Sequence, residues 1–164
     1  MSFKGTGNGN EMVIDVYPYI ITCAKHVAPS TMQAIIKTES NGNVLAIGLN
    51  KGWHLRYQAK NLSQAISWAN YLERYNYNFD IGLGQVNIRN AHKYGYLARD
   101  MLDPCKNLMV ASQILHRNYK AARNLTNNSQ HALYMAISAY NSGNYHTGFY
   151  NGYVLKVVNN AKEG

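Results

Sequence analysis

The sequence predicts a single α+β domain that is mainly helical and carries one small β-hairpin. Most of the chain places apolar residues at the spacing of amphipathic helices, between capping residues, prolines and glycines. Two stretches, residues 44–58 and 75–87, instead show short extended patterns around asparagine and glycine turns. With 164 residues, of which 46% are hydrophobic and 15% charged, the chain can bury one core and is not typical of disordered proteins.

We expect this domain to occupy residues 16–164. Residues 1–15 begin with a small, polar, glycine-rich segment, which predicts a flexible lead or a remnant of cloning. This chain shows no signal-peptide pattern, which is compatible with removal of a native signal peptide. Its apolar runs are too short to cross a bilayer, so no stable membrane insertion is expected.

Two helices are predicted at the start of the domain. The first covers residues 18–26, with one proline in its first turn and Pro29 closing it. The second covers residues 30–41 and ends before a glycine. Ser30 and Gln33 have the spacing of a capping box at its start.

The extended stretches follow these helices. Residues 44–49 and 53–57 alternate apolar and polar side chains around an Asn-Lys-Gly turn, which predicts that they pair as the β-hairpin. A helix capped by Asn61 or Ser63 comes next. Residues 75–87 contain too many asparagines and glycines for a helix, and we expect a second extended piece with a glycine turn.

Three further helices complete the domain. The first covers residues 103–124 and starts with an Asp-Pro pair, a typical N-cap and first-turn combination. The second covers residues 129–140 and ends at an Asn-Ser-Gly sequence. The third covers residues 153–161, after an aromatic loop that contains glycines.

The net charge of +8 favours an anionic partner, which could be nucleic acid, a membrane surface or a cell-wall polymer. The basic residues are scattered and form no nucleic-acid motif, so nucleic acid is not expected. The 14 tyrosines suit contacts with carbohydrate as well as with protein. We expect Trp53 and Trp68 in the core, although Trp53 on the hairpin could line a sugar cleft.

No cofactor and no metal are expected. Six histidines show no ligand motif, and the two cysteines, Cys23 and Cys105, lie far apart with no histidine at metal-ligand spacing. The cysteines could form one disulfide, which would indicate an oxidising compartment, or remain two buried thiols.

Glu39 is the candidate catalytic residue because it is an acid in an unexpected place. Met32, Ile35, Ile36 and Glu39 fall on one stripe of the second predicted helix, so the carboxylate lies on the apolar face. If that face is buried, desolvation raises the pKa of Glu39 toward that of a proton donor at neutral pH. A buried glutamate held by a structural hydrogen bond or an arginine is the alternative.

Five short motifs give a stronger combined signal than any of them alone. They are TES at 38–40, GLGQVN at 82–87, DPCKNL at 103–108, AYNSG at 139–143 and GYVLKV at 152–157. In order and separation they resemble the soluble lytic transglycosylase and goose-type lysozyme superfamily over roughly residues 16–161. The similarity is greatest to the specialised peptidoglycan lytic transglycosylases of type IV secretion and conjugation systems. It implies a lysozyme-like fold with the hairpin beside the active-site cleft.

The resemblance also implies roles for the matched residues. Glu39 matches the single catalytic acid, and Ser40 the serine that orients it. The other matched residues contact substrate or support the cleft in the family: Gly82, Leu83, Gly84, Gln85, Tyr140, Asn141 and Tyr153. Cys23 and Cys105 match the disulfide of the secretion-associated branch. Many relatives have methionine where Gly84 stands, which concerns subsite contacts and not the acid.

The implied reaction is cleavage of the bond between N-acetylmuramic acid and N-acetylglucosamine in peptidoglycan, with an anhydro-muramic product. The implied setting is periplasmic, where the enzyme opens the wall locally for a secretion or conjugation apparatus. A hydrolytic muramidase would need a second carboxylate, for which Asp80 is the candidate, although capping or turn support explains that residue better. A wall-binding assembly module without catalysis is the alternative from another class.

Overall fold

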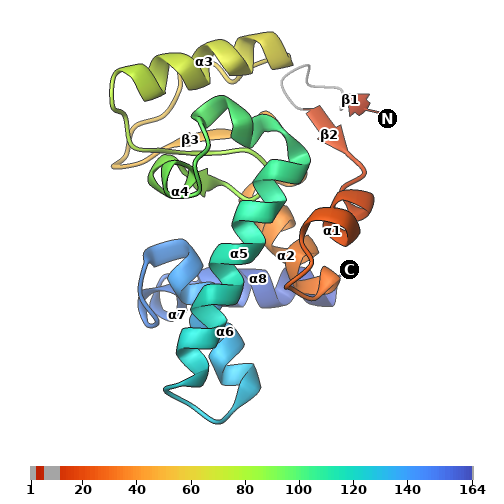
Figure 1. Cartoon of the computed structure of the whole chain (residues 1–164), viewed down its shortest axis with the longest axis vertical. Coiled ribbons are helices and arrows are strands. Elements are labelled where there is room, and N and C mark those ends of the chain that lie inside the picture. The colour runs from red at the N-terminus through yellow and green to blue at the C-terminus, as the bar shows by residue number, and fades with distance from the viewer. Residues whose placement is uncertain (1–2, 6–11, 164) are drawn as a thin grey trace.

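The computed structural model describes residues 3–5 and 12–163, and it confirms a mainly helical fold with a small antiparallel sheet (Figure 1). The helices are α1 (Tyr17–Cys23), α2 (Pro29–Glu39), α3 (Leu62–Arg74), α4 (Ile88–Lys93), the 3-10 helix η1 (Ala98–Leu102), α5 (Pro104–Arg123), α6 (Ser129–Ser142), α7 (Thr147–Tyr150) and α8 (Tyr153–Lys162). The strands are β1 (Phe3–Gly5), β2 (Met12–Ile14), β3 (Ile47–Leu49), β4 (Phe79–Ile81) and β5 (Val86–Asn87).

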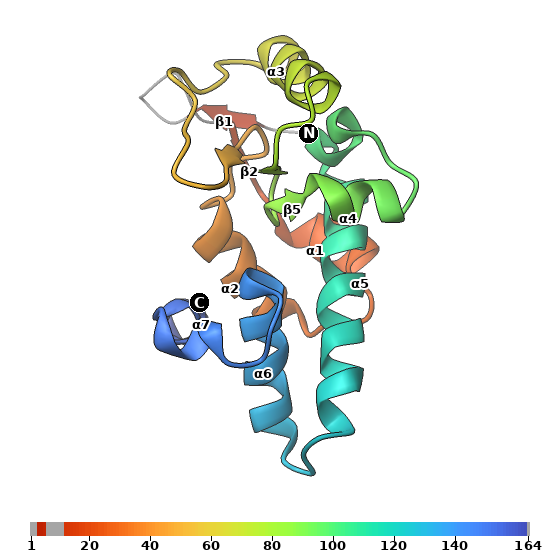
Figure 2. The ribbon, with the colours of Figure 1, turned by 90° about the vertical axis from the view of Figure 1, so that its left-hand side faces the viewer.

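The long helix α5 connects two parts of the molecule. The three-stranded sheet, α3 and α4 lie at one end of α5, and α6, α7 and α8 lie toward the other (Figures 1 and 2). Helix α5 packs against α1, α6 and η1, while α2 packs against α8. The apolar stripe of α2 is fully buried in the main core, which fixes the direction in which the end of this helix points.

The sheet has the order β3-β4-β5, and both pairings are antiparallel. Ile47 pairs with Ile81, and Leu49 with Phe79, so β3 finds its partner about thirty residues further along the chain. The extended character predicted for residues 75–87 is therefore confirmed, because this stretch supplies β4 and β5.

The predicted pairing of residues 44–49 with 53–57 is wrong, because residues 53–57 form no strand. The edge of β3 is occupied by β4, which offers buried apolar partners, whereas the stretch 53–57 buries only Leu55. Trp53 is 70% exposed, so its predicted place in the core is also wrong. Trp68 packs against the core while remaining partly exposed.

Side-chain caps fix two of the predicted helix starts. The Asn61 side chain accepts a hydrogen bond from the backbone N–H of Gln64, and Asp103 caps α5 in the same way through Lys106. The predicted capping box at Ser30 is wrong, because α2 begins at Pro29 and makes no side-chain cap. Proline lacks an N–H and suits the first position of a helix, so Pro29 opens α2 and does not close α1.

A disulfide joins Cys23 at the end of α1 to Cys105 at the start of α5, with 5.3 Å between the Cα atoms. The predicted pairing is thereby confirmed. A bridge that spans 82 positions constrains the unfolded chain strongly, which contributes roughly 4–5 kcal/mol on the chain-entropy model. It ties α1 to α5 beside the junction of the two parts of the molecule.

The predicted flexible lead at residues 1–15 lies partly outside the described residues, at 1–2 and 6–11. Within the described part, β1 and β2 pair with each other. The Met12 N–H donates to the side-chain Oδ1 of Asn43, and the Met12 carbonyl accepts from the Val44 N–H. Among the described residues, no helix is both long and apolar enough to cross a membrane.

Candidate active site

Glu39 is the last residue of α2, at the point where the buried stripe of that helix reaches a cleft. The cleft has a volume of about 420 Å³ and lies between β4, β5 and α4 on one side and the end of α6 on the other. It is lined by Glu39, Asn50, Asn78, Asp80, Gln85, Val86, Asn87, Arg89, Asn90, Lys93, Ile114 and residues 139–143. The carboxyl is thus packed by the core on one face and open to a polar cleft on the other.

Burial raises the pKa of Glu39 to about 7, from an ordinary 4.5, because desolvation disfavours the charged form. The hydrogen bond from Tyr153 lowers the pKa, the negative charge of Asp80 raises it, and the positive charge of Lys156 lowers it. The position also disfavours a carboxylate, since the C-terminal end of a helix carries partial negative charge. The group is therefore close to half protonated at neutral pH.

Tyr153 reaches Glu39 from the first turn of α8. Gly152 adopts φ 83°, a left-handed conformation that glycine takes without steric cost, and α8 begins immediately after it. The Tyr153 hydroxyl donates a hydrogen bond of 2.6 Å to Oε1 of Glu39. Burial and the Glu39 charge raise the pKa of Tyr153, so this phenol remains a neutral donor and holds the carboxyl in one orientation.

The turn at residues 82–85 is fixed to the helical side of the site by two hydroxyls. Ser40, directly after Glu39, donates a 2.7 Å hydrogen bond to the carbonyl of Leu83. Tyr140 on α6 donates to the carbonyl of Gly84. The Ser40 contact therefore couples the end of α2 to the turn.

Packing explains why glycine stands at positions 82 and 84. Gly82 has φ 80°, and a Cβ there would lie 2.2 Å from the carbonyl oxygen of Met101 and 2.3 Å from Nδ2 of Asn107. A Cβ at Gly84 would lie 2.8 Å from Cβ of Ala111 and 2.9 Å from the Tyr140 hydroxyl. Both positions are therefore closed to larger residues by protein atoms, whatever they contribute to substrate binding.

Asn107 is a structural residue of the site to which the sequence analysis assigned no role. It is fully buried, and its amide donates to the carbonyls of Ile81 and Met101 while its Oδ1 accepts from the Gly84 N–H. These three bonds hold the turn at 82–85 against η1 and α5. The residue lies within the DPCKNL motif, whose polar position in an otherwise apolar helix face was the available signal.

The predicted substrate-binding residues occupy different depths. The Leu83 side chain is buried in the core, so its carbonyl is the part that reaches the site. Gln85 lines the cleft. Its side-chain NH₂ is engaged, because it donates to the carbonyls of Ala46 and Gly82. Asn141 also lines the cleft, with Oδ1 accepting from Asn151.

Asp80 lies in the cleft wall, in the middle of β4. Asn87 donates a 2.9 Å hydrogen bond to its Oδ1, and Asn50 donates a longer one of 3.5 Å. Burial raises the pKa of Asp80, while these amides oppose the shift. These contacts tie Asp80 to Asn50 and Asn87, and its carboxyl lines the same cleft as Glu39.

Arg89 and Lys93 add positive charge to the cleft from α4, a helix that the sequence analysis did not predict. Asn87 caps this helix by accepting from the Arg89 N–H. The cleft therefore combines two carboxyl groups of raised pKa, Glu39 and Asp80, with several amides and two cations. This inventory suits proton transfer to a polar, anionic ligand.

Comparison with known proteins gives one family. The model described as "Transglycosylase SLT domain" matches residues 17–160. A relative from Brucella abortus biovar 1 (strain 9-941), "Type IV secretion system protein virB1", is 42% identical over 145 residues, which cover 85% of this chain and 60% of the relative. "Protein virB1" of Agrobacterium fabrum is 39% identical over 142 residues, covering 86% of this chain and 57% of the relative. The chain thus spans about 60% of the length of such relatives. No solved structure matches it significantly.

Gly82→Ala should destabilise the protein much more than Gly95→Ala. Both glycines have φ near 80°, but a Cβ at Gly95 would meet no atom within 4 Å. The control therefore carries only the left-handed backbone cost of about 1–2 kcal/mol. Crowding should add roughly another 1–3 kcal/mol at Gly82. Urea denaturation measures the free energy of unfolding of both variants. Equal decreases in the two variants would show that the turn tolerates the extra carbon.

Proposed function

Because this chain belongs to the transglycosylase SLT domain family, we propose that it is a peptidoglycan lytic transglycosylase with Glu39 as its acid and base. The observation that carries the proposal is the hydrogen-bonded carboxyl of Glu39, whose pKa is about 7 beside a polar cleft. A group with this pKa can both give and accept a proton near neutral pH.

In the first step, protonated Glu39 donates its proton to the oxygen that links N-acetylmuramic acid to N-acetylglucosamine. The bond between this oxygen and the anomeric carbon of the muramic acid breaks, and the N-acetylglucosamine leaves with the proton as its hydroxyl. The acetamido group of the muramic acid stabilises the positive charge on the anomeric carbon. The Tyr153 hydroxyl hydrogen-bonds the resulting Glu39 carboxylate.

In the second step, ionised Glu39 removes the proton from the primary hydroxyl of the same muramic acid. That oxygen attacks the anomeric carbon and closes an anhydro ring, so no water enters the product. Glu39 ends the cycle protonated, and the atoms and charges balance with one acid. Arg89 and Lys93 can hold the carboxylates of the peptide stems nearby.

The place of action that we propose is the periplasm, where the enzyme opens the wall locally for a type IV secretion or conjugation apparatus. Support comes from the relatives, one of which is named as a type IV secretion system protein. The Cys23–Cys105 disulfide is consistent with an oxidising compartment.

A hydrolytic muramidase is the second candidate function, and Asp80 is the observation in its favour. Asp80 shares the cleft with Glu39, and its charge acts on the Glu39 pKa. A second carboxylate could activate water or stabilise the charged sugar, as in glycosidases that use two acids. We prefer the first candidate because the asparagine amides of Asn50 and Asn87 already engage Asp80.

Mass spectrometry of products released from purified peptidoglycan separates these functions. The unaltered protein should release anhydro-muramic ends, and Glu39→Gln should lower the rate by at least about 10²–10⁴-fold, the usual contribution of general acid–base catalysis. Glu163→Gln is the matched control, since Glu163 pairs with Lys37 on the surface and does not line the cleft. Its rate should equal that of the unaltered protein.

Other products would contradict the proposal in different ways. Reducing muramic ends, which are heavier than anhydro ends by the mass of one water, would indicate hydrolysis. A loss of rate in Asp80→Asn as large as that in Glu39→Gln would then identify Asp80 as the second catalytic carboxylate. An absence of products from every form would favour a wall-binding module without catalysis. An active Glu39→Gln would remove Glu39 from the mechanism.

The rate should also fall as pH rises through about 7, because Glu39 then loses the proton that it must donate. Tyr153→Phe removes a hydrogen bond that lowers the Glu39 pKa, so this alkaline limb of kcat/KM should move to higher pH by about one unit. Tyr150→Phe, on an exposed tyrosine of α7, is the control. An unmoved limb in Tyr153→Phe would show that Glu39 does not set it.

A further inference from the structure

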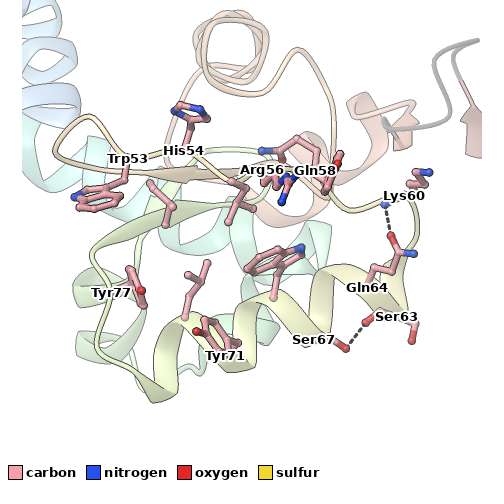
Figure 3. A pocket seen from close by; sticks show the side chains of 15 residues that line it. Trp53, His54, Arg56, Gln58, Lys60, Ser63, Gln64, Ser67, Tyr71 and Tyr77 are labelled. Carbon is pink, nitrogen blue, oxygen red and sulfur yellow. Dashed lines mark hydrogen bonds between the residues drawn. The ribbon is translucent and has the colours of Figure 1, made fainter.

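A second concave surface lies outside the catalytic cleft, between the segment 53–60 and helix α3. We call it the aromatic groove. Its volume is about 900 Å³, larger than that of the cleft, and its aromatic lining consists of Trp53, Tyr57, Trp68, Tyr71 and Tyr77. Figure 3 shows Trp53, Arg56 and Lys60 along the segment and Tyr71, Ser67 and Gln64 on α3, with the Gln64 side chain reaching across to the Lys60 backbone N–H. Nothing in the proposed catalytic mechanism uses this surface.

The groove and the cleft lie on opposite faces of one strand pair. Along β4 and the residues before it, Asn78 and Asp80 line the cleft, whereas Tyr77 lines the groove. Along β3, Leu49 lines the groove and Asn50 lines the cleft. Successive side chains of a strand point to opposite faces, which explains the division. The two surfaces meet where the Asn50 N–H bonds the Asn78 carbonyl.

The aromatic rings are exposed to an unusual degree. Trp53 is 70% exposed and Tyr57 67%, and both Tyr71 and Tyr77 are exposed as well. Aromatic faces in water favour the C–H faces of sugar rings and other flat apolar surfaces, and the tyrosine hydroxyls and the indole N–H add hydrogen bonds. Gln58, Gln64 and Ser67 supply further polar groups along the same walls. This mixture fits a sugar chain better than a purely apolar ligand.

The charge of the groove is positive. Arg56 and Lys60 line it, and no aspartate or glutamate is among its described lining residues. Arg56 stacks over the Tyr57 ring, with 5.5 Å between the guanidinium carbon and the ring centroid. Within the part of the chain that the structure describes, neither cation takes part in an ion pair. The groove therefore favours a polymer that carries carboxylates along with its sugars.

We propose that the aromatic groove is a second polysaccharide-binding site, which holds amino sugars and the carboxylates of their peptide stems away from the bond being cut. That the polymer is peptidoglycan rests on the proposed function above. The site keeps the protein on an insoluble wall between cuts, so that the cleft samples neighbouring bonds. Short soluble fragments, which cannot reach both surfaces, gain nothing from it.

Sedimentation with purified peptidoglycan sacculi tests the site. Every form carries Glu39→Gln so that the polymer is not consumed. Trp53→Ala, and separately Arg56→Gln with Lys60→Gln, should each raise the dissociation constant for sacculi by about five- to tenfold. All three positions are exposed, so these changes leave the core intact. The dissociation constant of the variant with Arg56→Gln and Lys60→Gln should also depend less on salt concentration.

Matched controls change the same chemistry elsewhere. Tyr150→Ala removes an aromatic ring that is 89% exposed, and Lys25→Gln with Arg117→Gln removes two exposed charges outside the groove. These should alter the dissociation constant by less than about twofold. With Glu39 intact, the groove variants should cleave a soluble tetrasaccharide fragment as fast as the unaltered protein.

Sacculi binding that survives both groove variants would overturn the proposal, because the polymer would then be held elsewhere on the protein. Equal losses in the controls would overturn it too, because binding would then follow net charge or general exposure. The failure of the catalytic proposal is distinct: a protein with Glu39 intact would release no products from sacculi, while the groove variants would still differ from their controls in binding.

Discussion

The desolvation of one carboxyl group at the end of α2 is the constraint on which the site depends. The apolar stripe of α2 is held in the core, and it delivers Glu39 to the cleft wall where the charged form is disfavoured. Tyr153 alone directs a hydroxyl at the group among the hydrogen bonds of the described residues. Desolvation raises the pKa of Glu39 and the Tyr153 hydrogen bond lowers it, so that Glu39 can both donate and accept a proton near neutral pH.

Hydrogen bonds to the turn at 82–85 hold the sheet opposite that carboxyl. Ser40 and Tyr140 bind successive carbonyls of the turn at 82–85, and Asn107 holds the same turn from behind. The turn then places β4 and β5, with their amides and Asp80, across from α2. A displacement of Asn107 or of the turn would therefore change the position of Glu39 through Ser40, although neither Asn107 nor the turn makes a hydrogen bond to Glu39 among the described residues.

Local patterns predicted α1, α2, α3, α5, α6 and α8 and the burial of α2, because these follow from spacing within one segment, whereas the short α4, η1 and α7 were missed. The place of Glu39 on the apolar stripe pointed to that acid, and the motif resemblance added Tyr153. The strand pairing failed because alternation shows which side chains face inward but not which distant strand takes the free edge of β3. Pro29 was misassigned because one proline can close a helix or open the next. Asn107 and the environment of Asp80 depend on contacts between segments, which single-segment patterns do not report.

A direct titration of Glu39 tests whether the cleft holds a proton donor at neutral pH. The measurement is the pH dependence of the side-chain carboxyl carbon shift in a protein labelled at glutamate, with Glu39→Gln used to assign the signal. Burial beside Tyr153 predicts a midpoint near 7. A midpoint near the ordinary 4.5 would contradict it, because a carboxylate ionised throughout the neutral range would leave the cleft without its acid.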